Sequence, residues 1–543
     1  MLPIVALLGL VLVVPAVAQK ADLIVENARI YTVNPAMPSA KAIAVAGEKI
    51  LAVGADVSSY AGPDTRRIDA HGAALIPGLI DSHGHMRGLG GLLESRDLRH
   101  VKTVAEIAEY VKQQATGRPA GEWVVGRNWD QTNWGGVFPS AKDLDAVVAD
   151  RPVFLTRVDG HAGWANSKAM ALAGIDDKTP DPAGGKILRD AQGKATGILV
   201  DRAQGLVRGK IPPPTFAQIK KQLELAVAEC ARLGLTGVHD AGVSEADLRA
   251  YKELIAEGKM PMRVWAMIGG EGLLWKQYLE KGPEIGSYLT VRAIKLYADG
   301  ALGSRGAALW QPYTDDKANS GLMMTTKEDI ERVAKQAAAR GFQVCTHAIG
   351  DRANRTVLDA YAAALQGKND KRFRVEHAQV ISLPDFQLFA DNSVIASVQA
   401  THATSDMRWI DKRVGPDRVA GAYAWQRFLK AGVPVANGSD FPVEEPNPML
   451  GLYAAITRQD VTGQPPGGWT PDQRMSRAQA LESWTLTGAY AAFEEKTKGS
   501  LEVGKLADFV ILDHDIMTAP VLDIVKTKVR LTVVGGKVVY EQK

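Results

Sequence analysis

Two histidines, His83 and His85, follow an apolar, strand-like run at residues 73–80. Residues two apart on an extended backbone point to the same side, so both imidazoles can reach one metal ion. Neutral imidazole is the commonest metal ligand among protein side chains. The chain has only ten histidines in 543 residues, and this pair predicts a metal site if further ligands come from elsewhere in the sequence.

The elements that must position this pair form a repeating pattern. Seven more strand-like runs alternate with helical stretches, which is typical of a parallel α/β fold, and eight such strands favour a (β/α)8 TIM barrel. The gap after the first strand, about residues 100–212, is too long for a simple crossover, so we expect an insertion there. The seven further runs are 237–240, 263–268, 292–297, 342–347, 373–377, 394–399 and 433–440.

Short alternating apolar runs with Gly and Asp turns occupy both ends of the chain. They predict one small β-sandwich domain assembled from residues 19–76 and 499–543. Such an assembly is reasonable because the ends of a domain often lie close together. The barrel would then span residues 77–498, with the insertion inside it.

Residues 1–18 predict a cleaved signal peptide. An apolar stretch is followed by Pro15 and by the small-x-small sequence from Ala16 to Ala18. We therefore expect an exported protein, periplasmic or secreted, without membrane insertion after cleavage. A membrane anchor is the alternative, although the run is shorter than the ~20 residues that span a bilayer. The net charge of +3 and the lack of a long basic run indicate no nucleic-acid partner.

Metal-capable side chains stand at the carboxyl ends of four more predicted strands, where barrel active sites are built. They are Lys295, His347, His377 and Asp440. Each has an ordinary structural explanation when taken alone, but their convergence on one barrel mouth favours a metal site. A charged Lys295 would repel a cation, whereas a buried, neutral amine can take up carbon dioxide and bridge two metals as a carbamate. An unmodified Lys295 paired with Asp299 is the alternative.

The segments that carry these residues resemble the amidohydrolase superfamily. They read PGLIDSHGH at 77–85, THAIGD at 346–351, EHA at 376–378, GSDFP at 438–442 and GSLEVGKLADF at 499–509. More narrowly, the chain is similar to the amidohydrolase family 3 branch that includes N-substituted formamide deformylases. That likeness is carried by GRNWDQ at 126–131, DGHAGWANS at 159–167 and KLYADGALGSR at 295–305.

The resemblance implies a site for two divalent metal ions, with a single ion as the alternative. Zinc suits the nitrogen and oxygen ligands, and manganese, iron or cobalt could replace it. Water between the ions would attack the substrate, and Asp440 would serve as general acid and base. The implied ligands are His83, His85, carboxylated Lys295 and Asp440 for the first ion, and Lys295, His347 and His377 for the second.

The implied function is that of a metal-dependent hydrolase cleaving a non-peptide C–N bond, such as an amide or N-acyl group, in a small-molecule substrate. One alternative is hydrolysis of a lactone, carbamate or other ester at the same site. Another is a non-catalytic binding or regulatory protein on the same scaffold, against which the complete ligand set argues. The sequence leaves the substrate and the oligomeric state open, a homo-oligomer included.

The insertion is predicted to form the wall of the substrate pocket, because aromatic bulk mixed with a few polar groups is typical of ligand pockets. The alternative for its tryptophans is a packed core of the insertion. Arg305 would bind a substrate carboxylate, or it would be a solvated or structural arginine. The predicted substrate-binding residues are Trp129, Asp130, His161, Trp164 and Arg305. His239 and His402, which end the second and seventh strands, receive no role.

Overall fold

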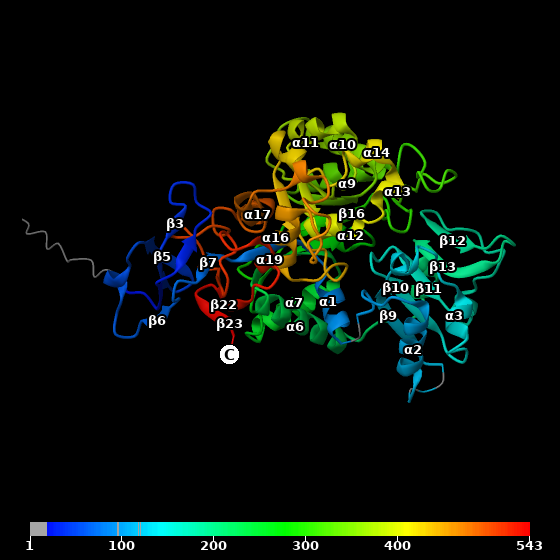
Figure 1. The fold of residues 1–543 in the computed structure, drawn as a ribbon, viewed down its shortest axis with the longest axis horizontal. Helices are drawn as coiled ribbons and strands as arrows, with labels where there is room; N and C mark the ends of the chain where they lie inside the picture. The colour runs from blue at the N-terminus through cyan, green and yellow to red at the C-terminus, as the bar shows by residue number, and fades with distance from the viewer. Residues whose placement is uncertain (1–18, 95–96, 118, 120, 543) are drawn as a thin grey trace, which may run out of the picture.

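Eight parallel strands form the centre of the molecule (Figure 1). The computed structural model describes residues 19–94, 97–117, 119 and 121–542, so the predicted signal peptide lies outside the described residues. The strands neighbour one another in chain order, which confirms the predicted α/β barrel. They are β8 (Leu79–Gly84), β14 (Leu235–Val243), β15 (Arg263–Gly269), β16 (Leu289–Tyr297), β17 (Gln343–Ala348), β18 (Arg374–His377), β19 (Ile395–Gln399) and β20 (Val435–Gly438).

The barrel closes where the carboxyl ends of β20 and β8 meet. The backbone N–H of Asp440 donates to the carbonyl oxygen of His83 at 2.7 Å. Gly438 permits this approach, because a Cβ there would lie 2.6 Å from both His83 N and Asp81 Oδ1. The Asp81 carboxylate in turn accepts from the backbone N–H and the hydroxyl of Ser439. Closure therefore brings Asp440 beside the histidine pair.

Helices cover the outside of the barrel. In α9, the buried residues Ile330, Val333, Ala334 and Ala337 follow the spacing of one helical face, and this face packs toward the strands. The outer helices are α6 (Phe216–Arg232), α7 (Glu245–Ala256), α8 (Leu274–Lys281), α9 (Lys327–Ala339), α10 (Asp351–Leu365), α11 (Phe386–Asp391), α15 (Trp425–Lys430), α17 (Arg477–Ser483) and α18 (Leu486–Ala491). Shorter helices in the connections are α1 (Met86–Leu93), α12 (Ala400–Asp406), α13 (Ile410–Val414), α14 (Pro416–Val419), α16 (Pro448–Thr457) and α19 (Val521–Ile524).

Two further sheets lie beside the barrel: one of four N-terminal strands, blue in Figure 1, and one of six strands that pairs blue and red strands from both ends of the chain. In the larger sheet, β7 pairs antiparallel with β21, and they share a buried apolar core with β1 and β4. The predicted joining of the two chain ends is therefore observed. The strands are β1 (Leu23–Glu26), β2 (Arg29–Tyr31), β3 (Ser39–Ala40), β4 (Ala42–Ala46), β5 (Lys49–Gly54), β6 (Arg66–Asp69), β7 (Ala74–Pro77), β21 (Phe509–Leu512), β22 (Val529–Val534) and β23 (Lys537–Glu541).

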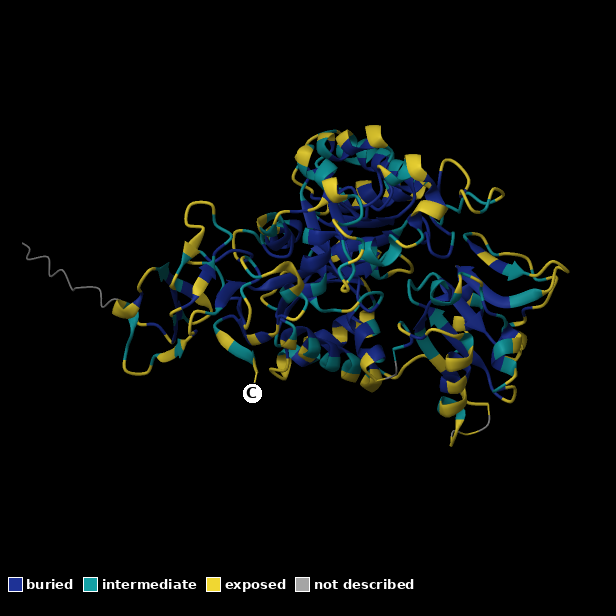
Figure 2. Cartoon of the chain, viewed as in Figure 1, coloured by how far each residue is buried: buried dark blue, intermediate teal, exposed yellow. Residues whose placement is uncertain are grey.

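The insertion after β8 folds around a five-stranded sheet of its own, in the order β12-β13-β11-β10-β9. It has separate apolar clusters, and Figure 2 shows its buried interior apart from that of the barrel. Its elements are α2 (Val104–Ala115), β9 (Val124–Trp129), α3 (Ala141–Asp145), β10 (Val153–Arg157), β11 (Ala162–Ala165), α4 (Ser167–Ala173), β12 (Gly185–Arg189), β13 (Ala195–Asp201) and α5 (Gln204–Arg208). Among the described residues, every helix is too short or too polar to span a membrane.

Candidate metal centre

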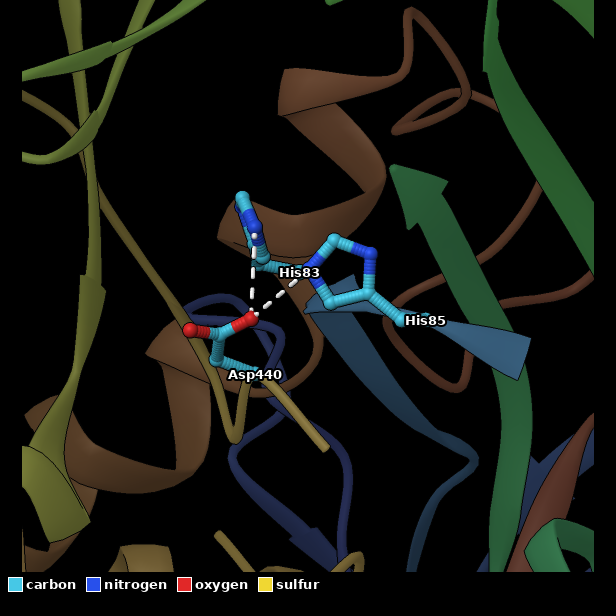
Figure 3. Close-up of side chains that lie close together, drawn as sticks. All are labelled: His83, His85 and Asp440. Carbon is cyan, nitrogen blue, oxygen red and sulfur yellow. Dashed lines mark ion pairs between the residues drawn. The ribbon is translucent and has the colours of Figure 1, made fainter. Parts of the chain in front are cut away.

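The predicted histidine pair and Asp440 meet at the barrel mouth (Figure 3). Asp440 Oδ1 lies 3.0 Å from His85 Nε2 and 3.5 Å from His83 Nε2. These three ligand atoms all lie within 4.8 Å of one another, which is a spacing that one metal ion can fill. Asp440 adopts a left-handed backbone conformation with φ of 60°, and such strain clusters at functional sites.

The opposite ring nitrogen of each of three histidines is held by an oxygen. His83 Nδ1 lies 2.5 Å from Glu376 Oε2, His85 Nδ1 lies 2.9 Å from the Ala241 carbonyl oxygen, and His377 Nδ1 lies 2.7 Å from Gln399 Oε1. An oxygen acceptor at Nδ1 fixes the tautomer in which Nε2 carries the lone pair. Metal-binding histidines are oriented in this way, so these rings are prepared as ligands.

Glu376 belongs to a buried charged network beneath the site. Arg374 Nε donates to Glu376 Oε1 at 2.7 Å, and Arg374 Nη1 lies 2.8 Å from His239 Nδ1. Burial alone would raise the pKa of Glu376, but the positive charge of Arg374 holds it well below its ordinary value. The carboxylate therefore stays ionised and able to hold His83. Sequence reasoning gave Glu376 and Arg374 no role, although both lie on the strand that ends in His377.

His347 and His377 come together on the other side of the site, with ring centroids 4.5 Å apart. His347 Nε2 lies 3.4 Å from the Gly300 carbonyl oxygen, which leaves Nδ1 as its available nitrogen. His402 lies beside His377, and its Nε2, 3.7 Å from Asp440 Oδ2, is buried without a hydrogen-bond partner among the described residues. The structure thus adds His402 to the site. Its position just after β19 is the sequence feature that could have indicated this role.

Lys295 lies inside the barrel, and its Nζ is 3.1 Å from His83 Nε2. Burial lowers the pKa of this amine and favours its neutral form. Asp299, the alternative partner considered for Lys295, instead accepts backbone N–H groups from Ala308, Ile349 and Gly350. Lys295 is therefore placed among the predicted ligands and is not paired with Asp299.

The donor set fits a divalent cation. Asp440 Oδ1 is buried and, among the described residues, has ring nitrogens as close neighbours but no hydrogen-bond partner. Burial alone would raise the pKa of Asp440, whereas His83 and His85 hold it well below its ordinary value. With His83 and His85 in the neutral tautomers that bind metals, this buried carboxylate oxygen would lack a positive partner. Nitrogen and oxygen ligands of this kind suit zinc.

A cavity of about 1430 Å³ opens above these residues, between the barrel mouth and the insertion. Asp130 and His161 line it, as predicted for substrate-binding residues. His161 Nδ1 lies 2.6 Å from Asp201 Oδ1, and its ring centroid is 5.1 Å from that of His347. Burial alone would lower the pKa of His161, but Asp201 raises it above its ordinary value. His161 is therefore held at the junction of cavity and metal site.

The predicted pocket role of the two tryptophans is corrected by their placement. Trp129 and Trp164 are fully buried in the core of the insertion, where their indole N–H groups donate to Leu155 O at 2.9 Å and Ser140 O at 2.8 Å. Their ring centroids are 5.8 Å apart. They therefore fit the packed-core alternative.

A bulge in β9 explains why Trp129 does not face the cavity. Asn128 adopts a φ of 75°, and the pairing of β9 with β10 shifts register there. This bulge puts Arg127 and Trp129 on opposite faces of the sheet, although regular alternation would put them on the same face.

Arg305 lies outside the cavity lining and pairs with Asp315 at 3.1 Å, so its predicted contact with substrate is also corrected.

The chain is similar to known proteins along most of its length. The model of the amidohydrolase family matches residues 66–540. The chain is 34% identical over 537 residues to the Arabidopsis thaliana protein LONG AFTER FAR-RED 3, covering 96% of this chain and 92% of that protein. It is 29% identical over 548 residues to N-substituted formamide deformylase of Arthrobacter pascens, covering 96% and 99%.

A solved structure is similar over the same length. It is an uncharacterized metal-dependent hydrolase from Pyrococcus horikoshii OT3, with a TM-score of 0.74 and 29% sequence identity. The similarity covers 92% of this chain and 99% of that chain. The structural similarity therefore extends over most of both chains.

Proposed function

We propose, from the premise that this chain belongs to the amidohydrolase family of metal-dependent hydrolases, that it cleaves the C–N bond of an amide or N-acyl compound. The substrate would be a small molecule that enters the cavity of about 1430 Å³ above the site. Similarity to a protein named N-substituted formamide deformylase supports this bond class.

One observation carries the proposal. Asp440 Oδ1, His83 Nε2 and His85 Nε2 converge at the end of the barrel, and no described residue makes a competing hydrogen bond to the carboxylate oxygen. Leaving such a carboxylate oxygen without a partner costs about 1–3 kcal/mol or more. A divalent cation would remove that cost.

The proposed ligand assignment follows the positions of the donor atoms. His83, His85 and Asp440 would hold one ion, and His347 and His377 a second, with carboxylated Lys295 shared between them. His402 is a further candidate ligand of the second ion, since it groups with His377 and Asp440. When bound, divalent metals of this kind lower the pKa of water and polarise a carbonyl group.

The protein's own groups would handle protons and orientation. Asp440, held ionised, would accept a proton from the attacking water and pass it to the leaving amine. Glu376 would keep His83 in its ligand tautomer through the Nδ1 contact. His161, with its pKa raised by Asp201, would donate a hydrogen bond to the substrate from the side that faces the cavity.

Lys295 would act as a carboxylated ligand. Burial lowers the pKa of its amine, which favours the neutral form that adds to carbon dioxide with loss of a proton, and the carbamate formed would offer two oxygens as ligands. In the single-ion alternative, Lys295 would stay unmodified and the first ligand group would suffice. Counting metal ions per chain separates the two schemes.

Metal removal and substrate screening test the proposed function. Protein purified with zinc or manganese should hydrolyse members of a panel of N-acyl amino acids, formamides and aryl amides. Chelator treatment should abolish that activity, and added metal should restore it. Turnover of lactones or carbamates alone would contradict the assigned bond, and a protein that binds no metal would support the non-catalytic alternative.

We further propose that the protein is exported. The sequence of residues 1–18 supports this location. N-terminal sequencing of the exported protein should find Gln19 first; an intact Met1 would contradict it.

A further inference from the structure

Two arginines from different elements of the insertion line the same cavity. Arg127 stands on β9, and Arg208 ends α5; both line the cavity shared with Asp440. Arg127 pairs in register with Thr156 of β10, and Arg208 Nη2 donates to Thr156 Oγ1 at 3.2 Å. Register partners on parallel strands face the same side of a sheet. Thr156 therefore places both arginines on the same face of the sheet, and Arg208 lies near enough for its charge to act on Arg127.

Neither arginine has an acidic partner. Arg127 Nε donates to the amide oxygen of Asn128 at 3.0 Å, and among the described residues no carboxylate lies within ion-pair distance of Arg127 or Arg208. Four of the five other arginines that line the cavity contrast with them, because each has a carboxylate partner; the exception among the described residues is the exposed Arg202. These pairs are Arg87 with Asp247, Arg99 with Asp97, Arg157 with Asp130, and Arg408 with Asp130.

The electrostatic environment of Arg127 is unfavourable for a cation. Burial lowers its pKa to about 10, and the nearby positive charge of Arg208 contributes to that shift. Arg127 still carries its full charge at neutral pH. Asp97 and Asp440 offset part of this effect from beyond ion-pair distance, but burial and the positive charges of Arg208 and Arg99 outweigh them. An anion bound directly to the guanidinium group would relieve the remaining repulsion.

Arg127 also reaches toward the metal site. A Cβ added at Gly88 would lie 3.1 Å from both Arg127 Nη1 and Pro442 Cδ. Gly88 follows His85 by three residues, and Pro442 follows Asp440 by two. The guanidinium group therefore stands next to the segments that present the first group of ligands.

We propose that Arg127 and Arg208 form an oxyanion-binding subsite that holds a carboxylate of the substrate while its amide lies at the metal centre. The assignment to a substrate rests on the proposed function; the binding of an anion does not. Paired guanidinium groups match carboxylate oxygens in bidentate geometry. The preferred substrate class is then an acidic amide, such as an N-acyl amino acid.

Calorimetric titration tests this subsite without any reaction. The probes are 3-phenylpropionate, its neutral counterpart 3-phenylpropanol, glutarate and inorganic phosphate, none of which contains an amide. Wild-type protein loaded with zinc should bind at least one carboxylate and should bind 3-phenylpropanol at least about tenfold more weakly. Tighter binding of phosphate than of both carboxylates would contradict a carboxylate subsite and indicate a phosphorylated ligand.

Matched variants locate the binding. Arg127→Gln and Arg208→Gln should each weaken carboxylate binding at least about tenfold, and Arg127→Lys, which keeps the charge but loses the fork, should weaken it less. Arg87→Gln, which removes an arginine paired with Asp247, should leave affinity unchanged. No carboxylate binding, or equal affinity in wild type and both Gln variants, would overturn the proposal.

A separate kinetic arm distinguishes the two proposals. For wild-type protein, an N-acyl amino acid should be hydrolysed faster than its matched carboxamide, mainly through a lower KM, and Arg127→Gln should remove this preference. If carboxylates bind through the arginines but no amide is hydrolysed, the proposed function fails and the subsite stands. Hydrolysis without a preference for the acid would contradict the subsite alone.

Discussion

The barrel mouth and the insertion line the same cavity, but they place their polar groups by different means. At the barrel mouth, the side chains follow the ends of parallel strands, and buried groups such as Glu376 and Asp81 hold them in position. In the insertion, a bulge at Asn128 decides which residue faces the cavity. The barrel mouth thus provides the proposed reactive groups, whereas the bulge in the insertion determines which side chains face the substrate cavity.

This contrast makes opposite substitutions informative. A change at the barrel mouth should remove turnover and leave the fold intact, because the strands there are held by their backbone pairing. A change in the tryptophan core of the insertion should cost stability before it costs turnover.

Asp440→Asn should lower kcat by at least about 10³-fold, because the general acid–base group and a metal ligand are lost together. Thermal unfolding should occur near the wild-type temperature. Steady-state kinetics and metal analysis on the same preparation check this. Asp64→Asn, on an exposed loop far from the cavity, is the control. Wild-type activity in Asp440→Asn would contradict the proposal that the reaction takes place at the barrel mouth.

Lys295→Ala should lower kcat by about 10²-fold or more, since one shared ligand is removed. Added acetate or propionate should restore part of the activity by supplying the missing carboxylate oxygens. Wild-type protein given the same acids serves as the control and should not be stimulated. Loss of activity without rescue, together with one metal ion per chain, would favour the single-ion scheme.

Trp129→Ala should lower the free energy of unfolding by about 3–5 kcal/mol through loss of packing in the core of the insertion. The kcat/KM of the folded fraction should change by only a few-fold, because the indole does not line the cavity. Urea unfolding and kinetics at low temperature measure the two effects. A large loss of kcat/KM at unchanged stability would indicate that Trp129 does form part of the pocket wall.

Much of the barrel and its site could be predicted from the sequence. Alternation of strands and helices indicated eight parallel strands, and parallel strands bring their carboxyl ends together whatever the distance along the chain. His83, His347 and Asp440 could therefore be assigned to one place without knowledge of their contacts. The run at 73–80, interpreted as a single barrel strand, instead divides: β7 pairs with β21 in the small domain, and β8 begins the barrel.

Other features depended on geometry that residue spacing does not contain. Regular alternation would put Arg127 and Trp129 on one face, and only the bulge at Asn128 separates them. His402 follows its strand inside a short helix, so strand periodicity did not indicate its direction. The lack of an acidic partner for Arg208 is visible only when the surrounding side chains are placed.

Anomalous diffraction from crystals of the zinc-loaded protein tests the central claim most directly. The account predicts a zinc peak about 2.0–2.2 Å from Nε2 of His83 and His85 and from a carboxylate oxygen of Asp440. A second peak should lie beside His347 and His377, with density for a carboxylated Lys295 between the two. Zinc bound elsewhere, or histidines turned away from a common centre in an active protein, would contradict the account.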